Sequence, residues 1–147
     1  MTIKFYSVQD EYGEFSNFAY YPIKLRGRVW PTTEHYFQAM KFNSAIDQNE
    51  ILNAKSPIEA ARKGRDRKRK IKKNWESSEV GVMREALSAT FTQHPELKIL
   101  LLSTGESKLI EHTENDSYWG DGGDGGDGSG KNMLGMLLME IRNGFKS

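Results

Sequence analysis

Cysteine is absent from the 147-residue chain, and histidine occurs only three times. Without cysteine there are no disulfides, no thiolate metal sites and no cysteine nucleophile, and the composition fits a reducing compartment. The three histidines are far apart in sequence and lack the spacing of zinc ligands. We therefore expect an activity that requires neither a metal nor another cofactor.

The chain also lacks a strong net charge and a long apolar run. Lys and Arg total 21 against 20 Asp and Glu, so global charge favours no class of charged partner. No apolar stretch approaches the roughly 20 residues of a membrane span, and the first residues lack the apolar core of a secretory signal. We expect a soluble, cytoplasmic protein without a membrane partner.

The length suits one ordinary domain, which we place at residues 1–147. Strands and helices do not alternate as a doubly wound fold requires, so we predict an α+β fold with several helices packed around a small sheet. The expected elements are a strand at 3–7, a hairpin at 21–30 turning at Arg26-Gly27, helices at 33–42, 47–55, from 56 onward, 75–93 and 95–103, a strand at 108–112, and a helix at 132–145.

The best-defined helix start is Ser56-Pro57-Ile58-Glu59. Serine suits the N-cap position, proline the first helical position, and the glutamate is placed to return the capping hydrogen bond. In 75–93, Val80, Met83, Leu87 and Phe91 recur at helical spacing and predict a stripe that faces the core. We expect the 95–103 helix to be short and buried.

The glycine-rich stretch after Trp119 partly matches several binding motifs, but it lacks the neighbouring structure or residues that those motifs require. Residues 120–125 read G-x-G-x-x-G but do not lie between a strand and its crossover helix, and 125–132 resemble a P-loop with Asn132 where a metal-binding Ser or Thr belongs. The Gly-Asp units also resemble a calcium-binding repeat, but only one copy is present and such repeats need stacked neighbours. Two interpretations stay open: a phosphate clasp of backbone N–H groups with Lys131 at a helix start, or a solvated acidic loop without a ligand.

Residues 62–73 form a strongly basic run that contains no aromatic side chain. Such runs are usually solvated, and this one offers no ring on which a base could stack. Arg62 and Arg65 lie about one helical turn apart and could form a compact anion fork.

The helix predicted at 33–42 places Glu34, Gln38 and Lys41 on one stripe. A polar stripe commonly faces solvent. This helix is rich in aromatic residues, however, so little of its circumference can be exposed without stranding apolar rings. A buried glutamate suits general acid or base work near neutrality, because burial raises the pKa of a carboxyl group.

Five motifs occur in an order and spacing that point to a known family. They are Phe15-Ser16-Asn17-Phe18, the run from Trp30 to Ala39 (WPTTEHYFQA), Lys73-Asn74-Trp75, the run from Glu111 to Asp116 (EHTEND), and the run from Tyr118 to Gly122 (YWGDG). Together they resemble the NADAR family, also called YbiA-like N-glycosidases, over nearly the whole chain. The insert 124–129 departs from the expected pattern and puts the geometry of the phosphate clasp in doubt.

The resemblance implies a compact α+β fold and hydrolysis of an N-glycosidic bond. The expected substrates are ribosylamino-pyrimidine 5′-phosphates of riboflavin biosynthesis, which release ribose 5-phosphate. The alternatives are removal of ADP-ribose from guanine in DNA or RNA, and non-catalytic sensing of ADP-ribose or NAD-like ligands. The expected partner is thus a phosphorylated ribosylamine, with ADP-ribosylated nucleic acid as the second candidate.

The resemblance also implies site residues. Breaking a C1′–N bond builds positive charge on the sugar, so we expect a carboxylate pair, Glu34 and Asp121, at the reaction. Lys41 either captures C1′ of the ring-opened sugar as a Schiff base, or is a structural ion pair or a solvated lysine. Trp75 and Trp119 are candidates for stacking on the base, with core packing as the alternative for Trp75. The remaining predicted substrate-binding residues are Asn17, Phe18, Arg62, Arg65, Lys131 and Asn132.

Overall fold

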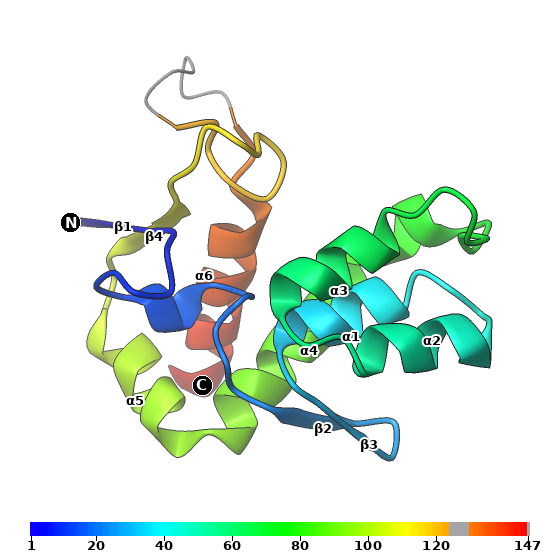
Figure 1. The fold of residues 1–147 in the computed structure, drawn as a ribbon. Coiled ribbons are helices and arrows are strands. Elements are labelled where there is room, and N and C mark those ends of the chain that lie inside the picture. Colours follow the sequence, from blue (N-terminus) through cyan, green and yellow to red (C-terminus); the bar gives the residue numbers. More distant parts are fainter. Residues whose placement is uncertain (124–129, 147) are drawn as a thin grey trace. The chain divides into compact units, whose positions relative to one another are not determined.

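The computed structural model describes residues 1–123 and 130–146, which form two units (Figure 1). One unit comprises residues 1–19 and 94–147, and the other comprises residues 20–93. The elements of the first unit are β1 (Thr2–Phe5), the 3-10 helix η1 (Gly13–Phe15), α5 (Pro95–Ser103), β4 (Lys108–Glu111) and α6 (Met133–Lys146). Those of the second are β2 (Ile23–Leu25), β3 (Arg28–Trp30), α1 (Thr33–Ala39), α2 (Ala45–Leu52), α3 (Pro57–Gly64) and α4 (Trp75–Gln93).

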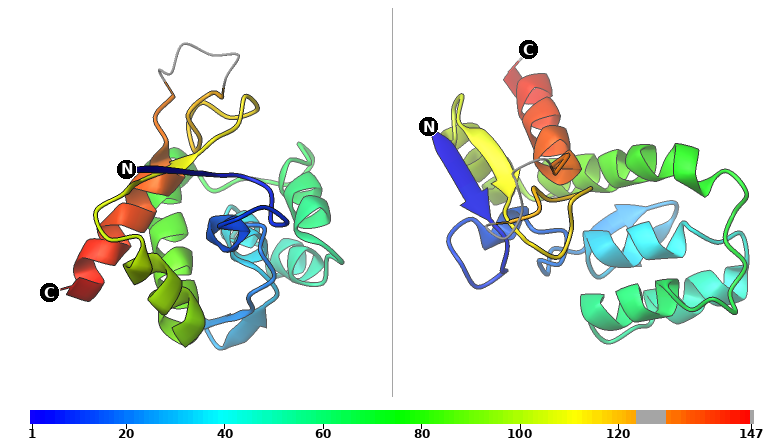
Figure 2. Two further views of the ribbon diagram at one scale, coloured as in Figure 1. Left: turned by 90° about the vertical axis from the view of Figure 1, so that its left-hand side faces the viewer. Right: turned by 90° about the horizontal axis from the view of Figure 1, so that it is seen from above.

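These elements confirm the predicted α+β class, but the small sheet is in fact two separate two-stranded sheets. β1 pairs in parallel with β4 from residue 2 opposite 108 to residue 5 opposite 111, and the two strands lie side by side in Figure 2. β2 and β3 form an antiparallel hairpin that turns at Arg26 and Gly27, as predicted. Both turn residues have positive φ angles, 55° and 75°, which glycine adopts readily at the second position.

In the 20–93 unit, α1 contacts α2, α3, α4 and β3. Every residue of α1 is buried, which agrees with the aromatic density of this helix. Thr32 caps it by accepting a hydrogen bond from the His35 N–H. The helix ends at Ala39, three residues before the predicted end, and the Lys41 carbonyl instead accepts a hydrogen bond from Lys72 N–H at 2.8 Å.

The start of α3 confirms the predicted cap. Ser56 Oγ accepts a hydrogen bond from Glu59 N–H at 3.1 Å, and Glu59 Oε2 accepts one from the N–H of Lys55 at 2.8 Å. The return bond therefore reaches one residue earlier than in a standard capping box. Along α4 the stripe is buried at Met83, Leu87 and Phe91, whereas Val80 is only half-buried.

The other unit is built on β4. α6 packs on this strand and contacts α5, and Leu134, Leu137, Leu138 and Ile141 supply its buried face. The prediction of a buried α5 is wrong: Leu97 and Leu101 are buried, but Ile99 is 69% exposed. This nine-residue helix buries only the stripe of Leu97 and Leu101, and the continuous apolar run of residues 99–102 hides that stripe in the sequence pattern.

No helix within the described ranges 1–123 and 130–146 is long and apolar enough to cross a membrane.

Candidate active-site residues

A carboxylate, an amide and an amine lie near one another in the unit 20–93. Glu34 and Gln38 of α1 are both buried, each with 5% of its surface exposed. Their spacing of four residues brings the side chains together, and Gln38 Nε2 donates a hydrogen bond to Glu34 Oε2 at 2.7 Å. The prediction that this polar stripe is turned away from solvent is confirmed for Glu34 and Gln38, whereas Lys41 is half-buried.

Gly64, the last residue of α3, packs against the side chain of Gln38. A Cβ atom at position 64 would lie 2.0 Å from Gln38 Oε1, so only glycine permits the observed approach of α3 to α1. Gln38 Oε1 is buried without a hydrogen-bond partner among the described residues. The amide orientation is fixed by its other end, because the Glu34 carboxylate requires a donor.

Lys41 completes the group and is linked to the same glycine. Its Nζ donates a hydrogen bond to the Gly64 carbonyl at 3.3 Å. Burial lowers the pKa of the Lys41 ammonium, the charge of Glu34 raises it, and the charge of Arg65 lowers it again, so that the pKa lies below its usual 10.5. A larger fraction of neutral amine is therefore present at a given pH than for an exposed lysine.

The predicted anion fork, Arg62 and Arg65, lies on the same unit. Arg62 is in the last turn of α3, and Arg65 caps that helix in the right-handed helical conformation. Both side chains are exposed. Of the two arginines, only Arg65 lowers the pKa of Lys41, so the two are not equivalent.

Trp75, at the start of α4, is a core residue rather than an open stacking surface. It is 6% exposed, and its ring centroid lies 5.1 Å from that of Phe37. Its burial therefore supports core packing, the alternative to stacking on a base.

In the other unit, Asp121 organises the loop that follows β4. One carboxylate oxygen lies 2.9 Å from His112 Nδ1, and the other accepts hydrogen bonds from the N–H groups of Gly123 at 2.8 Å and Thr113 at 3.3 Å. Burial alone would raise the pKa of Asp121, but these hydrogen bonds and the His112 charge hold it below its usual value. The Asp121 carboxylate is therefore kept in its charged form.

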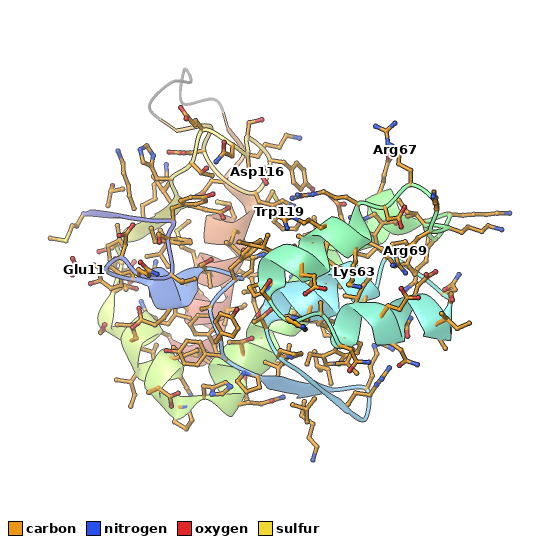
Figure 3. The ribbon with its side chains drawn as sticks, viewed as in Figure 1. Glu11, Lys63, Arg67, Arg69, Asp116 and Trp119 are labelled. Carbon is orange, nitrogen blue, oxygen red and sulfur yellow. The ribbon has the colours of Figure 1, made fainter. Side chains whose placement is uncertain are left out.

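Trp119 and Lys131 lie around Tyr118. Trp119 is half-buried, with its ring edge-on to Tyr118 at 5.2 Å, and its backbone N–H donates to Asp116 Oδ1 at 2.8 Å (Figure 3). Lys131 is exposed, and its Nζ lies 5.6 Å from the centroid of the Tyr118 ring. A cation over an aromatic face is attracted by the negative face of the ring, so this contact positions the Lys131 side chain.

The backbone N–H groups at the start of α6 do not contribute to the predicted phosphate clasp. The backbone N–H groups of Lys131, Asn132, Met133 and Leu134 donate to the carbonyls of Ser117, Gly120, Tyr118 and Trp119 respectively, at 2.8 to 3.0 Å. These donors are occupied by the loop itself and are not available to an anion. The insert 124–129 lies outside the described residues.

Asn132 is a predicted substrate-binding residue, but its side chain joins β4 to α6. Oδ1 accepts a hydrogen bond from Glu111 N–H and Nδ2 donates to the Leu109 carbonyl, both at 2.9 Å. The residue is buried and has a positive φ of 53°, a conformation that asparagine tolerates better than most residues. Both ends of the Asn132 side-chain amide are thus used within the fold, and a contact with substrate stays a prediction.

Asn17 and Phe18 follow η1, and both are half-buried. The Phe18 N–H donates a hydrogen bond to Ser16 Oγ at 3.1 Å. This local bond fixes the backbone of the motif but leaves its contribution to substrate binding a prediction.

Sequence reasoning missed Gln38 as a functional residue and Gly64 altogether. The four-residue spacing of Glu34 and Gln38 is a usable signal for their hydrogen bond. Nothing in the sequence marks Gly64, because its partner lies on another helix.

The comparisons with known proteins agree with this structure. The NADAR domain model matches residues 4–146. The chain is 59% identical over 140 residues to N-glycosidase YbiA of Escherichia coli K12, covering 95% of this chain and 86% of that protein. It is 40% identical over 156 residues to the maize chloroplastic riboflavin biosynthesis protein PYRR, covering 96% of this chain but 25% of that longer protein.

A solved structure shows the same fold. The NMR structure of the E. coli protein YbiA matches with a TM-score of 0.90 and 56% identity, over 99% of this chain and 85% of that one. The chain therefore belongs to the NADAR family.

Proposed function

We propose that this chain is an N-glycosidase that hydrolyses the C1′–N bond of ribosylamino-pyrimidine 5′-phosphates, the early intermediates of riboflavin biosynthesis. The names of its relatives, an N-glycosidase and a riboflavin biosynthesis protein, support this reaction class and this pathway. The structural observation that carries the proposal is the buried Glu34, held by Gln38 on the helix that leads to Lys41.

Glu34 is the proposed acid/base residue. Cleavage of the C1′–N bond leaves positive charge on the sugar and a basic amine on the pyrimidine, so the site needs a carboxyl group that handles a proton at a fixed position. The hydrogen bond from Gln38 Nε2 occupies Glu34 Oε2 and orients the group.

Lys41 is the proposed nucleophile. A ring-opened ribosylamine exposes C1′ as an imine carbon, to which the neutral Lys41 amine adds; the pyrimidine amine then leaves with a proton. Water adds to the resulting Schiff base and releases ribose 5-phosphate and free lysine. The lowered pKa of Lys41 supports this role because only the neutral amine is nucleophilic.

Arg65 is the proposed contact for the negatively charged phosphate, with Arg62 as its neighbour on α3. For Asn17, Phe18, Trp119 and Asp121, participation in the reaction rests on the resemblance of their motifs. Lys131 is a proposed phosphate contact because it lies just before the start of α6. The lowered pKa of Asp121 favours a role as a permanent anion over a role as a proton donor.

Hydrolysis of ADP-ribosylated guanine in nucleic acid is the second candidate, since it breaks the same kind of bond. The exposed basic run 62–73 favours it. Supplying the purified protein with a ribosylaminopyrimidine phosphate and, separately, with ADP-ribosylated guanine DNA distinguishes the two. We expect release of the free base from the pyrimidine; release from the DNA alone would select the second candidate, and release from neither, with tight ADP-ribose binding, would support a sensor.

The role of Glu34 is tested by Glu34→Gln, which keeps an oxygen to accept the Gln38 hydrogen bond. We expect kcat to fall by about 100-fold or more, the usual contribution of general acid–base catalysis, with little change in Tm. Glu76→Gln, an exposed position on α4, is the matched control. Turnover near that of the wild type in Glu34→Gln would remove Glu34 from this role.

The role of Lys41 is tested by adding borohydride during turnover, which reduces a Schiff base to a stable adduct. Mass spectrometry should find the sugar phosphate on the peptide containing Lys41. Lys41→Ala should lose both the adduct and the activity, whereas Lys70→Ala, at an exposed lysine, should keep both. Activity surviving in Lys41→Ala would contradict the covalent route while leaving the role of Glu34 intact.

A further inference from the structure

The segment 62–73, here called the basic segment, carries nine Lys or Arg side chains and a single acidic one, Asp66. The whole chain has a net charge of only +1, so the residues outside this segment carry an excess of negative charge. Such local asymmetry creates a positive surface that the overall charge conceals.

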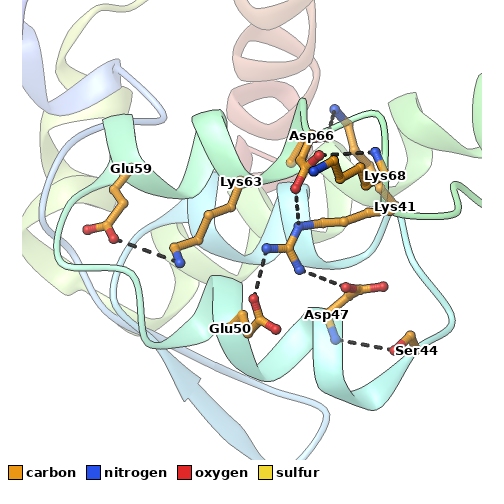
Figure 4. Close-up of polar contacts among 10 residues, drawn as sticks. Lys41, Ser44, Asp47, Glu50, Glu59, Lys63, Asp66 and Lys68 are labelled. Atoms are coloured by element: carbon orange, nitrogen blue, oxygen red, sulfur yellow. Dashed lines mark hydrogen bonds and ion pairs between the residues drawn. The ribbon is translucent and has the colours of Figure 1, made fainter.

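Two of the nine cations are neutralised within the fold. Arg69 lies between Asp47 at 2.7 Å and Glu50 at 2.8 Å, with Asp66 at 3.7 Å (Figure 4). Lys63 forms a partly exposed ion pair with Glu59 at 3.9 Å. Arg69 is thus a structural residue that attaches the segment to α2.

The other seven cations form no ion pair with any described residue, and six of them are exposed, Lys72 being half-buried. Figure 3 shows Arg67 pointing away from the segment. These seven residues are Arg62, Arg65, Arg67, Lys68, Lys70, Lys72 and Lys73.

The backbone that carries these cations is held in place by hydrogen bonds to other residues of the unit. Lys72 N–H donates to the Lys41 carbonyl at 2.8 Å, and Ile71 forms an isolated bridge with Phe42. Asp66 Oδ1 accepts a hydrogen bond from the N–H of Lys68 at 3.0 Å. A positioned backbone lowers the entropy lost when the side chains engage a partner.

We propose that the basic segment is a binding surface for the phosphodiester backbone of a nucleic acid. A polyanion can engage many of the unpaired cations at once, whereas a single small anion would use two or three of them. The absence of aromatic side chains from 62–73 excludes base stacking within the segment, so the binding is independent of base sequence. This surface does not depend on which glycoside the protein hydrolyses.

The test measures fluorescence anisotropy of a labelled, unmodified DNA of mixed sequence, about 30 nucleotides long, single-stranded and duplex, with the full chain. The variant Arg67→Glu/Lys68→Glu/Lys70→Glu changes three exposed cations whose side chains have no partner in the described structure. The matched control, Lys4→Glu/Lys24→Glu/Lys55→Glu, makes the same change in net charge at exposed lysines elsewhere.

The logarithm of the wild-type binding constant should fall linearly with the logarithm of salt concentration, because phosphate contacts release counterions. The segment variant should bind at least about tenfold more weakly at about 100 mM salt and show a shallower slope, while the control stays within about twofold of the wild type. N-glycosidase turnover and Tm should be unchanged in both variants.

Three results would overturn the proposal. They are no binding at about 50 mM salt, equal loss in both variants, and binding to vesicles of anionic phospholipid without binding to DNA. The last result would indicate a membrane surface as the partner.

Discussion

At the scale of single residues, the proposed chemistry depends on the lowered pKa of Lys41. Burial lowers its pKa, Glu34 opposes this effect, and Arg65 reinforces it. Between the lowered pKa and the usual 10.5, the folded protein holds fewer protons on Lys41 than the unfolded chain does, so stability rises with pH across that window. The same shift favours the nucleophilic form below the pKa of a free lysine.

This balance predicts a specific pH profile. Formation of the borohydride-trapped adduct should increase with pH and level off at a pH below 10.5. Arg65→Gln removes a cation that disfavours the ammonium, so the rise should move to higher pH. The measurement is the initial rate of adduct formation from about pH 6 to about pH 10.

Arg67→Gln, which removes a neighbouring exposed charge that does not act on Lys41, should leave the profile in place. An unchanged profile in Arg65→Gln would show that Arg65 does not tune Lys41, whatever its effect on KM.

At the scale of the elements, the approach of α3 to α1 depends on the missing side chain at Gly64. A Cβ there would overlap the buried amide of Gln38, which in turn orients Glu34. Close packing of this kind cannot absorb an added methyl group without moving a neighbour.

We therefore expect Gly64→Ala to lower the free energy of unfolding by about 1–3 kcal/mol, the usual effect of overpacking, and to lower kcat through displacement of Gln38. Gly81→Ala is the matched control, since Gly81 is also helical but its Cβ would meet nothing within 4 Å. That change should stabilise the protein by about 0.5–1 kcal/mol with unchanged activity.

Chemical denaturation and steady-state kinetics of the two variants measure these effects. A Gly64→Ala protein with wild-type kcat would show that the Gln38–Glu34 hydrogen bond does not depend on the packing of α3.

At the scale of the whole molecule, the two units differ in how the chain builds them. Residues 20–93 are continuous, whereas the other unit needs both ends of the chain, because β1 pairs with β4. A parallel pair separated by about a hundred residues closes a long loop and forms only when the intervening chain is organised.

We therefore predict that residues 1–147 unfold as one domain. Each unit holds about half of the chain, a size at which an isolated core is only marginally stable. Calorimetry should give one transition whose van't Hoff and calorimetric enthalpies agree. Fluorescence of Trp119 in one unit, and of Trp30 and Trp75 in the other, should change at the same temperature. Two resolved transitions would contradict the single-domain prediction.

The sequence by itself determined the local structure of this protein. The cap at Ser56, the extent of α4, the turn at Arg26-Gly27 and the four-residue spacing of Glu34 and Gln38 depend on neighbours in the chain, so local patterns predict them. The family is likewise identified by its motifs, because each motif is a short run of adjacent residues.

Only the tertiary structure decided which polar groups already form hydrogen bonds or ion pairs within the fold. Asn132 and the N–H groups at the start of α6 look available for phosphate in the sequence, but distant carbonyls and N–H groups of β4 and its loop occupy them. Gly64 owes its importance to Gln38 on another helix, and Arg69 of the basic segment is neutralised by Asp47 and Glu50 of α2. Each of these features depends on contacts between residues far apart in the chain, which no local pattern encodes.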